Sequence, residues 1–211
     1  MAKEKTNPKS KTREYLEAIG LAVILALVIR TWGVQAFKIP SESMKPTLLV
    51  GDHLLVFKSS YDIKYPFSDR VLFAVGDPKR GDIVVFRFPE DRDKDFIKRI
   101  IGLPGDTVEV RGRKVFINGR EMKDPWGHYS DNKRLPPGVQ YASNFGPVKV
   151  PPGHYFVMGD NRDQSYDSRY WRSGHFVPRQ DILGRAFVIY WAWEDNTWGV
   201  RWRRIGKLLL D

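Results

Sequence analysis

The 211-residue sequence contains no cysteine and only four histidines. Without cysteine the fold has no disulfide bond, and this absence is compatible with an oxidising compartment without requiring one. The histidines are His53, His128, His154 and His175, and they stand in no recognisable catalytic spacing. If the chain carries a catalytic base, we therefore look for it among other residue types.

Acidic residues are outnumbered, 25 against 35 lysines and arginines, which gives a formal net charge of +10. Such an excess favours anionic partners, either nucleic acid or the inner face of a membrane. Five of the positive residues fall within the first thirteen positions. This tail accounts for much of the charge, so we predict a phospholipid membrane and no nucleic acid as partner. The 42% apolar content is enough for the core of one ordinary domain.

Residues Tyr15 to Phe37 follow the basic tail and are almost free of charge between Glu17 and Arg30. As a helix these residues would measure about 34 Å, enough to cross a bilayer. This predicts a cytoplasmic tail over 1–13, a transmembrane anchor over 14–37 and the remaining chain on the outer face of the cell membrane. A cleaved signal peptide fits the local pattern equally well, because the uninterrupted apolar run is short and the segment Val34 to Ala36 resembles a cleavage site.

Beyond residue 50 the apolar pattern is typical of strands, with Gly, Pro and Asp between short runs of Val, Ile and Phe. The predicted fold class is mainly antiparallel β after one N-terminal transmembrane helix. The predicted strands are His53–Lys58, Asp82–Phe88, Phe96–Ile101, Thr107–Val110, Lys114–Ile117, His154–Met158 and Arg185–Trp193.

A hairpin closing at Gly112, followed by an Asn118-Gly119 turn, opens a proline-rich stretch. We predict that residues 107–152 form a small inserted lobe of strands and loops. Residues 38–106 and 153–211 then form the main β domain.

Ser41 and Ser43 lie in "PSESMKPTLLVGD", which by itself indicates only a turn between proline residues. A nucleophilic serine needs a base, and a neutral lysine can serve if apolar neighbours disfavour its charged form. In "FIKRIIGLPGD" an extended strand places Phe96, Lys98 and Ile100 on one face. On these residues alone, a surface lysine with its amine in water remains the simpler interpretation.

The stretch "GDNRDQSYDSR", residues 159–169, has the acidic spacing of a calcium loop. However, Arg162 occupies a ligand position, and Ser165 stands where the loop requires glycine. We therefore predict no metal site and an ion-paired loop instead.

Together, and in this order after an apolar segment, the three stretches resemble the conserved boxes of bacterial type I signal peptidases. The resemblance implies a membrane-anchored serine protease without cofactor, which removes signal peptides from preproteins after small residues with a serine–lysine dyad. It also implies that the apolar segment is retained as an anchor.

Carried over by position, the resemblance implies that Ser43 is the nucleophile and Lys98 the general base. Ser41 would hold the oxyanion together with the Ser43 backbone N–H, and Ser165 would orient the lysine amine. The implied supporting residues are Asp167 and Arg169, and the implied pocket residues are Ile39, Pro40, Met44, Leu48 and Phe96. Gln164 and Phe96 depart from the residues common in the family, asparagine and tyrosine respectively.

Two alternatives stay open: a self-cleaving Ser/Lys protein, and a non-catalytic membrane-anchored β module that binds peptides or lipids. The aromatic residues near the carboxyl end also allow two interpretations, a membrane interface or, for the first two, an ordinary core. These residues are Trp191, Trp193, Trp198 and Trp202, with Arg201, Arg203 and Arg204 among them.

Overall fold

The computed structural model describes residues 11–65, 68, 70–129, 144–194 and 199–209. Its helices are α1 (Lys11–Trp32) and the 3-10 turns η1 (Lys58–Ser60), η2 (Arg179–Asp181) and η3 (Trp202–Arg204). Its strands are β1 (Val34–Lys38), β2 (Asp52–Phe57), β3 (Asp62–Lys64), β4 (Val71–Ala74), β5 (Ile83–Phe88), β6 (Asp91–Gly102), β7 (Thr107–Arg111), β8 (Lys114–Ile117), β9 (Arg120–Glu121), β10 (Asn144–Lys149), β11 (His154–Met158), β12 (Val177–Pro178) and β13 (Ile182–Ala192).

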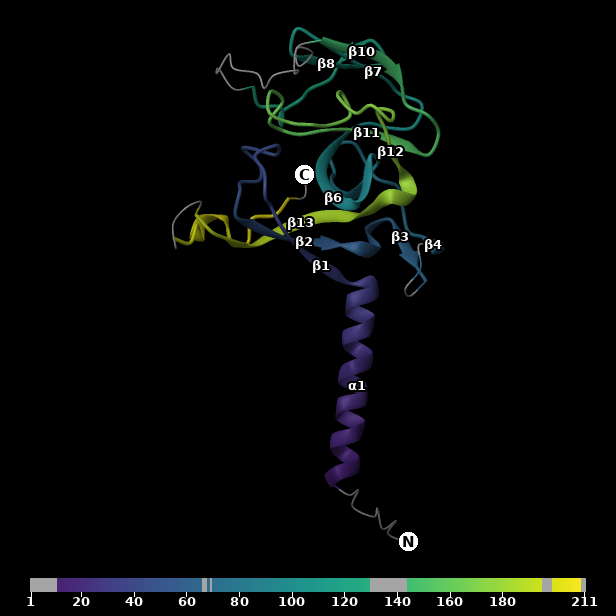
Figure 1. The fold of residues 1–211 in the computed structure, drawn as a ribbon, viewed down its shortest axis with the longest axis vertical. Coiled ribbons are helices and arrows are strands. Elements are labelled where there is room, and N and C mark those ends of the chain that lie inside the picture. The colour runs from purple at the N-terminus through teal and green to yellow at the C-terminus, as the bar shows by residue number, and fades with distance from the viewer. Residues whose placement is uncertain (1–10, 66–67, 69, 130–143, 195–198, 210–211) are drawn as a thin grey trace, which may run out of the picture.

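The strands form three sheets (Figure 1). The largest has seven strands in the order β1-β2-β13-β5-β6-β11-β12, a second has the order β10-β7-β8-β9, and β3 pairs with β4. All ladders between these strands are antiparallel. The prediction of a mainly antiparallel β fold is therefore confirmed.

The seven predicted strands all appear, with ends that differ by a few residues, and Lys114–Ile117 and His154–Met158 match residue for residue. The predicted turn after β8 is also present: Asn118 and Gly119 have φ values of 53° and 79°, which suit a tight hairpin turn. Sequence analysis missed β1, β3, β4, β9, β10 and β12. Most of these are short, and β10 contains a Gly-Pro pair that interrupts its pairing with β7.

Apolar side chains of the main sheet fill two cores. One core lies around β2 and β13, and it also takes up Met44 and Leu48 from the turn after β1. The other lies between β5, β6 and β11 and contains Trp171. A third cluster joins β7 and β8 to Phe156 and Met158 of β11, so the second sheet packs against the main one. The predicted division into a catalytic domain and an inserted lobe over 107–152 stays a prediction.

The N-terminal helix α1 projects away from the strands (Figure 1). Its carboxyl end is held by two hydrogen bonds: the Trp32 indole donates to the Lys64 carbonyl at 2.6 Å, and the Ser59 hydroxyl donates to the Trp32 carbonyl at 2.5 Å. Among the residues that the structure describes, no helix has the length and apolar character needed to cross a membrane.

The predicted anchor over 14–37 also needs a correction at its carboxyl end. The helix ends at Trp32, and Val34–Lys38 forms strand β1, which pairs with β2 from Val34 opposite Phe57 to Lys38 opposite His53. The apolar character of this segment misled the sequence analysis, because a sheet-edge strand and the end of an apolar helix have similar compositions. Only the partner strand distinguishes them.

Candidate functional site

Ser43 lies in a compact turn that follows β1. The Lys45 N–H donates to the Glu42 carbonyl at 3.0 Å, and the Leu48 N–H donates to the Met44 carbonyl at 2.9 Å. Because Met44 and Leu48 are fully buried, they fix the turn to the core. The Ser43 side chain is held in a defined place, and the residue is 7% exposed.

Lys98 lies on β6 opposite Val84 of β5, and it is 4% exposed. Phe96 and Ile100 pack into the apolar cluster on the face that the alternation predicted. The Lys98 amine lies 5.4 Å from the centroid of the Phe96 ring. The same amine donates to the Ser43 hydroxyl at 2.7 Å and to the Ile97 carbonyl at 3.0 Å. The two residues singled out in different sequence stretches are thus in direct contact.

The surroundings of Lys98 lower its pKa from 10.5 to about 8. Burial is the largest cause, because it disfavours the charged ammonium. The nearby carboxylates of Asp167 and Asp160 act in the opposite direction, and the Arg169 guanidinium adds to the lowering. A substantial fraction of the amine is therefore neutral near pH 8, as proton acceptance from a hydroxyl requires.

A buried carboxylate connects the segments that carry the two residues. Asp160 accepts two hydrogen bonds from Arg99, at 2.8 and 2.7 Å, and one from the Thr47 hydroxyl at 2.5 Å. Arg99 and Asp160 are 2% and 0% exposed. Since Arg99 follows Lys98 and Thr47 lies four residues after Ser43, this carboxylate fixes both segments to the 159–169 loop.

The same loop contacts the Ser43 turn through its backbone. The Asn161 N–H donates to the Ser43 carbonyl at 3.1 Å, and the Asn161 side-chain amide donates to the Glu42 carbonyl at 3.1 Å. A side chain at Gly159 would collide with the Ser43 carbonyl and with the Ser165 hydroxyl. The loop therefore needs glycine at this position for reasons of space.

Asp167 and Arg169 form an ion pair with both side chains fully buried, at 2.9 Å. Burial disfavours the charged carboxylate, but the charge and hydrogen bonds of Arg169 outweigh it, so the pKa of Asp167 lies below its ordinary value. Arg169 also donates to the Arg162 carbonyl at 2.7 Å, and the Gly159 N–H donates to Asp167 at 2.9 Å. The pair closes the loop on itself, beside Lys98.

The structure does not reproduce the contact implied for Ser165. Its hydroxyl is buried and has no partner in hydrogen-bond geometry within the described residues, while the Lys98 amine donates to Ser43 and Ile97. Ser165 lies close enough to the Asp167 carboxylate to contribute to its lowered pKa.

Ser41, implied to hold the oxyanion, lies beside Ser43, with its hydroxyl oxygen 3.4 Å from that of Ser43. The implied pocket residues fall into different environments. Ile39, Met44 and Leu48 are buried in the first core, whereas Pro40 is exposed. Phe96 packs in the second core, stacked on Phe88 with 4.2 Å between ring centroids.

Among the described residues, no cluster of three or more His, Cys, Asp or Glu side chains could hold a metal ion. Sequence analysis missed the roles of Thr47, Arg99, Asp160 and Asn161. Their residue types are ordinary for turns and strands, and only the fold shows that they meet. The expectation of an ion-paired loop over 159–169 was the nearest signal.

We predict that Asp160→Ala destabilises the protein by about 3–5 kcal/mol, because it leaves the buried Arg99 guanidinium without its partner. Urea denaturation measures the free energy of unfolding. Glu121→Ala is the matched control, since it breaks an exposed ion pair with Lys114 and should cost at most about 1 kcal/mol. Equal losses in the two variants would contradict a special role of Asp160.

Comparison with known proteins extends the resemblance to most of the chain. A family model described as "Signal peptidase, peptidase S26" matches residues 12–191. Signal peptidase I of Pseudomonas fluorescens is 39% identical over 219 residues, which cover 91% of this chain and 77% of the relative. Signal peptidase I of Leptolyngbya laminosa is 43% identical over 189 residues, covering 86% and 81% of the two chains.

Signal peptidase I P of Bacillus subtilis subsp. natto is 42% identical over 196 residues, covering 92% of this chain and 97% of the relative. A crystal structure of a signal peptidase I from Enterococcus faecalis matches 53% of this chain and 98% of that chain, at 34% identity and a TM-score of 0.43. Because this superposition is loose, the assignment rests on the family model and the sequence relatives. The chain belongs to the signal peptidase family, peptidase S26.

Proposed function

We propose that this protein is a serine endopeptidase that removes signal peptides from exported preproteins, with Ser43 as nucleophile and Lys98 as general base. The observation that carries the assignment of residues is the 2.7 Å contact between the Ser43 hydroxyl and a buried lysine amine. The names of the relatives, signal peptidase I, support the substrate class.

In the proposed reaction, the neutral Lys98 amine takes the Ser43 proton while the serine oxygen attacks the scissile carbonyl. The tetrahedral intermediate then collapses, and the resulting Lys98 ammonium gives its proton to the leaving amine of the mature protein. A water molecule, deprotonated by the same amine, attacks the acyl-enzyme; the resulting ammonium returns this proton to the Ser43 oxygen as the signal peptide leaves. The amine ends neutral after each half-reaction, so the cycle balances.

Ser41 supports the developing oxyanion in this proposal, together with the Ser43 backbone N–H. The 3.4 Å between the two hydroxyl oxygens leaves the Ser41 side chain next to the carbon under attack. An oxyanion donor of this kind is worth about 3–4 kcal/mol of the barrier.

Asp167, Arg169 and Ser165 are proposed as positioning residues. Their buried ion pair shapes the loop that faces Lys98, and its two opposite charges shift the lysine pKa in opposite directions. Burial is the largest cause of the lowered lysine pKa, and the Asp167 and Asp160 carboxylates oppose it. Ser165 would act through its neighbour Asp167, because its hydroxyl does not bond to the amine in this structure.

An open strand edge favours binding of the substrate as an added β-strand. In β6, residues Arg99 to Gly102 pair with β11, whereas the half of the strand before Lys98 pairs only with β5 within the described residues. An extended peptide can pair with the remaining edge through its backbone. Ile39, Met44 and Leu48 would then form the floor beneath the small side chain before the cut, with Pro40 and Phe96 at its margin.

The central test compares Ser43→Ala and Lys98→Met on a purified preprotein, with cleavage followed by electrophoresis and mass spectrometry. Both variants are expected to lose cleavage, because one lacks the nucleophile and the other the base. Lys94→Met is the matched control: it removes an exposed lysine of the same strand and should retain activity. A non-catalytic peptide-binding module would cleave nothing even as wild type, and persisting activity in Lys98→Met would refute the base.

The fold of Lys98→Met provides its own check. The folded-state pKa of Lys98, about 8, lies below the unfolded value, so burial of the charge costs stability at pH 7 and the cost disappears as pH rises to about 10.5. Methionine removes this cost and should raise the free energy of unfolding at pH 7 by up to about 3 kcal/mol. Lost activity in a more stable protein cannot be attributed to misfolding.

The pH profile gives an independent prediction. Because only the neutral amine accepts a proton, kcat/KM should rise about tenfold per pH unit below pH 8 and level off above it. Steady-state cleavage of one peptide from pH 6 to 10 measures the profile, and circular dichroism at each pH checks the fold. A midpoint near 6.5, or no change through pH 8, would argue for a different base.

We further propose that α1 attaches the protein to a membrane. Its large apolar side chains from Leu16 to Ile29 are 43–66% exposed, a continuous surface that needs a partner. Trp202, at the edge of a ring cluster with Trp191 and Trp193, is 71% exposed and can contribute to the same attachment. Trp198 lies outside the described residues. A single-pass topology, with the N-terminus cytoplasmic and the catalytic part outside, stays a prediction.

Flotation of the full chain with phospholipid vesicles tests the attachment. Leu25→Asp places a charge in the exposed apolar surface of α1 and should weaken vesicle binding roughly 100-fold, given the cost of a carboxylate in the bilayer. Asn144→Asp adds the same charge to an exposed residue of the second sheet and should have little effect. Equal flotation of both variants would place the lipid contact outside α1.

A further inference from the structure

Residues 124–129, which follow β9, pack against the loop that lies beside Lys98. The His128 N–H donates to the Asp160 carbonyl at 2.7 Å, and the Arg162 N–H donates to the His128 carbonyl at 2.8 Å. These two bonds form a parallel bridge between His128 and Asn161. The segment therefore supports, through its backbone, the part of the loop that bonds the Ser43 carbonyl.

Asp124 holds the same loop through its side chain. Its carboxylate accepts hydrogen bonds from both terminal nitrogens of Arg162, one of them at 2.9 Å, and the Arg162 Nε donates to the Gly159 carbonyl at 3.1 Å. The Arg162 side chain is fully buried, and that of Asp124 is 13% exposed. A Cβ at Gly127 would lie 2.7 Å from the Asp124 carboxylate and 2.8 Å from Arg162, so the close approach of the two chains requires glycine there.

Trp126 of the same segment contacts the other half of the site, on β6. The Arg99 guanidinium lies over its ring, 4.7 Å from the ring centroid. The ring also packs against Gly81, where an added Cβ would come within 3.0 Å of it, and the Gly81 carbonyl accepts a hydrogen bond from Arg99 at 2.7 Å. Arg99 is thus held by Asp160, Gly81 and Trp126, and it directly follows Lys98 in the sequence.

We infer that Asp124 and Trp126 are positioning residues of the proposed protease, which keep Ser43 and Lys98 in contact from outside the site. This inference rests on the proposed function. Asp124 acts through Arg162 and the loop that bonds the Ser43 carbonyl, and Trp126 acts through Arg99. One short segment therefore supports both residues of the dyad. A misplacement of about 1 Å can cost about 100-fold in rate, so small shifts of this segment should lower kcat.

The test separates positioning from stability, because a residue that only stabilises the fold changes the amount of folded protein and not the rate of each folded molecule. We measure kcat and KM for one preprotein-derived peptide, normalised to the folded fraction from circular dichroism. Asp124→Ala and Trp126→Leu should each lower kcat about 10-fold to 100-fold. KM should stay within about twofold of wild type, because the lost support acts on the reacting groups and not on the strand edge proposed to bind the peptide.

Conservative variants and a control sharpen the test. Trp126→Phe keeps an aromatic ring over the guanidinium and should retain kcat within about threefold of wild type. Asp124→Asn keeps an acceptor for Arg162 without the charge, so its kcat should lie between those of wild type and Asp124→Ala. Asp106→Ala is the matched control: the Asp106 side chain is also 13% exposed, and it pairs with Arg80 at 2.8 Å. This variant should lose stability but keep kcat within about twofold.

Unchanged kcat in both Asp124→Ala and Trp126→Leu, with wild type active, would overturn the inference and leave the proposed function standing. An equal loss of kcat in Asp106→Ala would also overturn it, because a general loosening of the fold would then explain the effect. No cleavage by wild type would instead refute the proposed function. If Asp124→Ala fails to fold, Asp124→Asn and the comparison of Trp126→Phe with Trp126→Leu decide.

Discussion

The arrangement of the site depends on one buried carboxylate. Asp160 binds Arg99 of β6 and Thr47 of the serine turn, three residues that are far apart in the sequence. Arg99 follows Lys98 in the sequence, and Thr47 lies four residues after Ser43. The 2.7 Å contact of Ser43 with Lys98 joins two segments 55 residues apart, and a flexible connection would not hold it. The carboxylate and the Asn161 amides make that connection rigid.

Lys98 is unlike the other buried cations around it. Arg99 and Arg169 each form an ion pair with a buried aspartate. Lys98 instead donates to a hydroxyl and a carbonyl, and within the described residues no carboxylate lies in ion-pair contact with it. An ion pair would stabilise the ammonium and remove the neutral form. The fold thus gives each of these arginines a carboxylate partner and leaves the Lys98 amine in an apolar setting. Burial of this amine lowers the stability of the protein, as is typical of a functional site.

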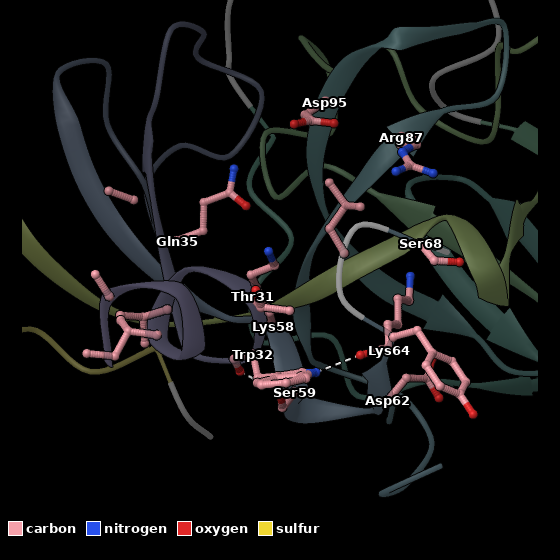
Figure 2. Close-up of a pocket in the computed structure, with 16 residues that line it drawn as sticks. Thr31, Trp32, Gln35, Lys58, Ser59, Asp62, Lys64, Ser68, Arg87 and Asp95 are labelled. Carbon is pink, nitrogen blue, oxygen red and sulfur yellow. Dashed lines mark hydrogen bonds between the residues drawn. The ribbon is translucent and has the colours of Figure 1, made fainter. Parts of the chain in front are cut away.

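The open strand edges connect this site to the rest of the molecule. The largest sheet pairs β11 with only one half of β6 and leaves β1 without a second neighbour in the described part of the chain. Exposed edges are usually covered or shortened in stable proteins. Here residues of both strands, Gln35 of β1 and Asp95 of β6, line a cavity beside the carboxyl end of α1 (Figure 2). The helix proposed for membrane attachment, the proposed substrate strand and the cavity therefore all lie beside these two strand edges.

The sequence by itself determined most strands of the largest sheet and the face of β6 on which Lys98 lies, because period-two alternation is a local property. The family boxes implied Ser43 and Lys98 without locating them in space. Only the tertiary structure decided that Val34–Lys38 is a strand, that Asp160 joins Arg99 to Thr47, and that the Ser165 hydroxyl does not hydrogen-bond to the amine. These features depend on partners more than ten residues away, and a local pattern of residue types carries no information about which distant partner a side chain meets.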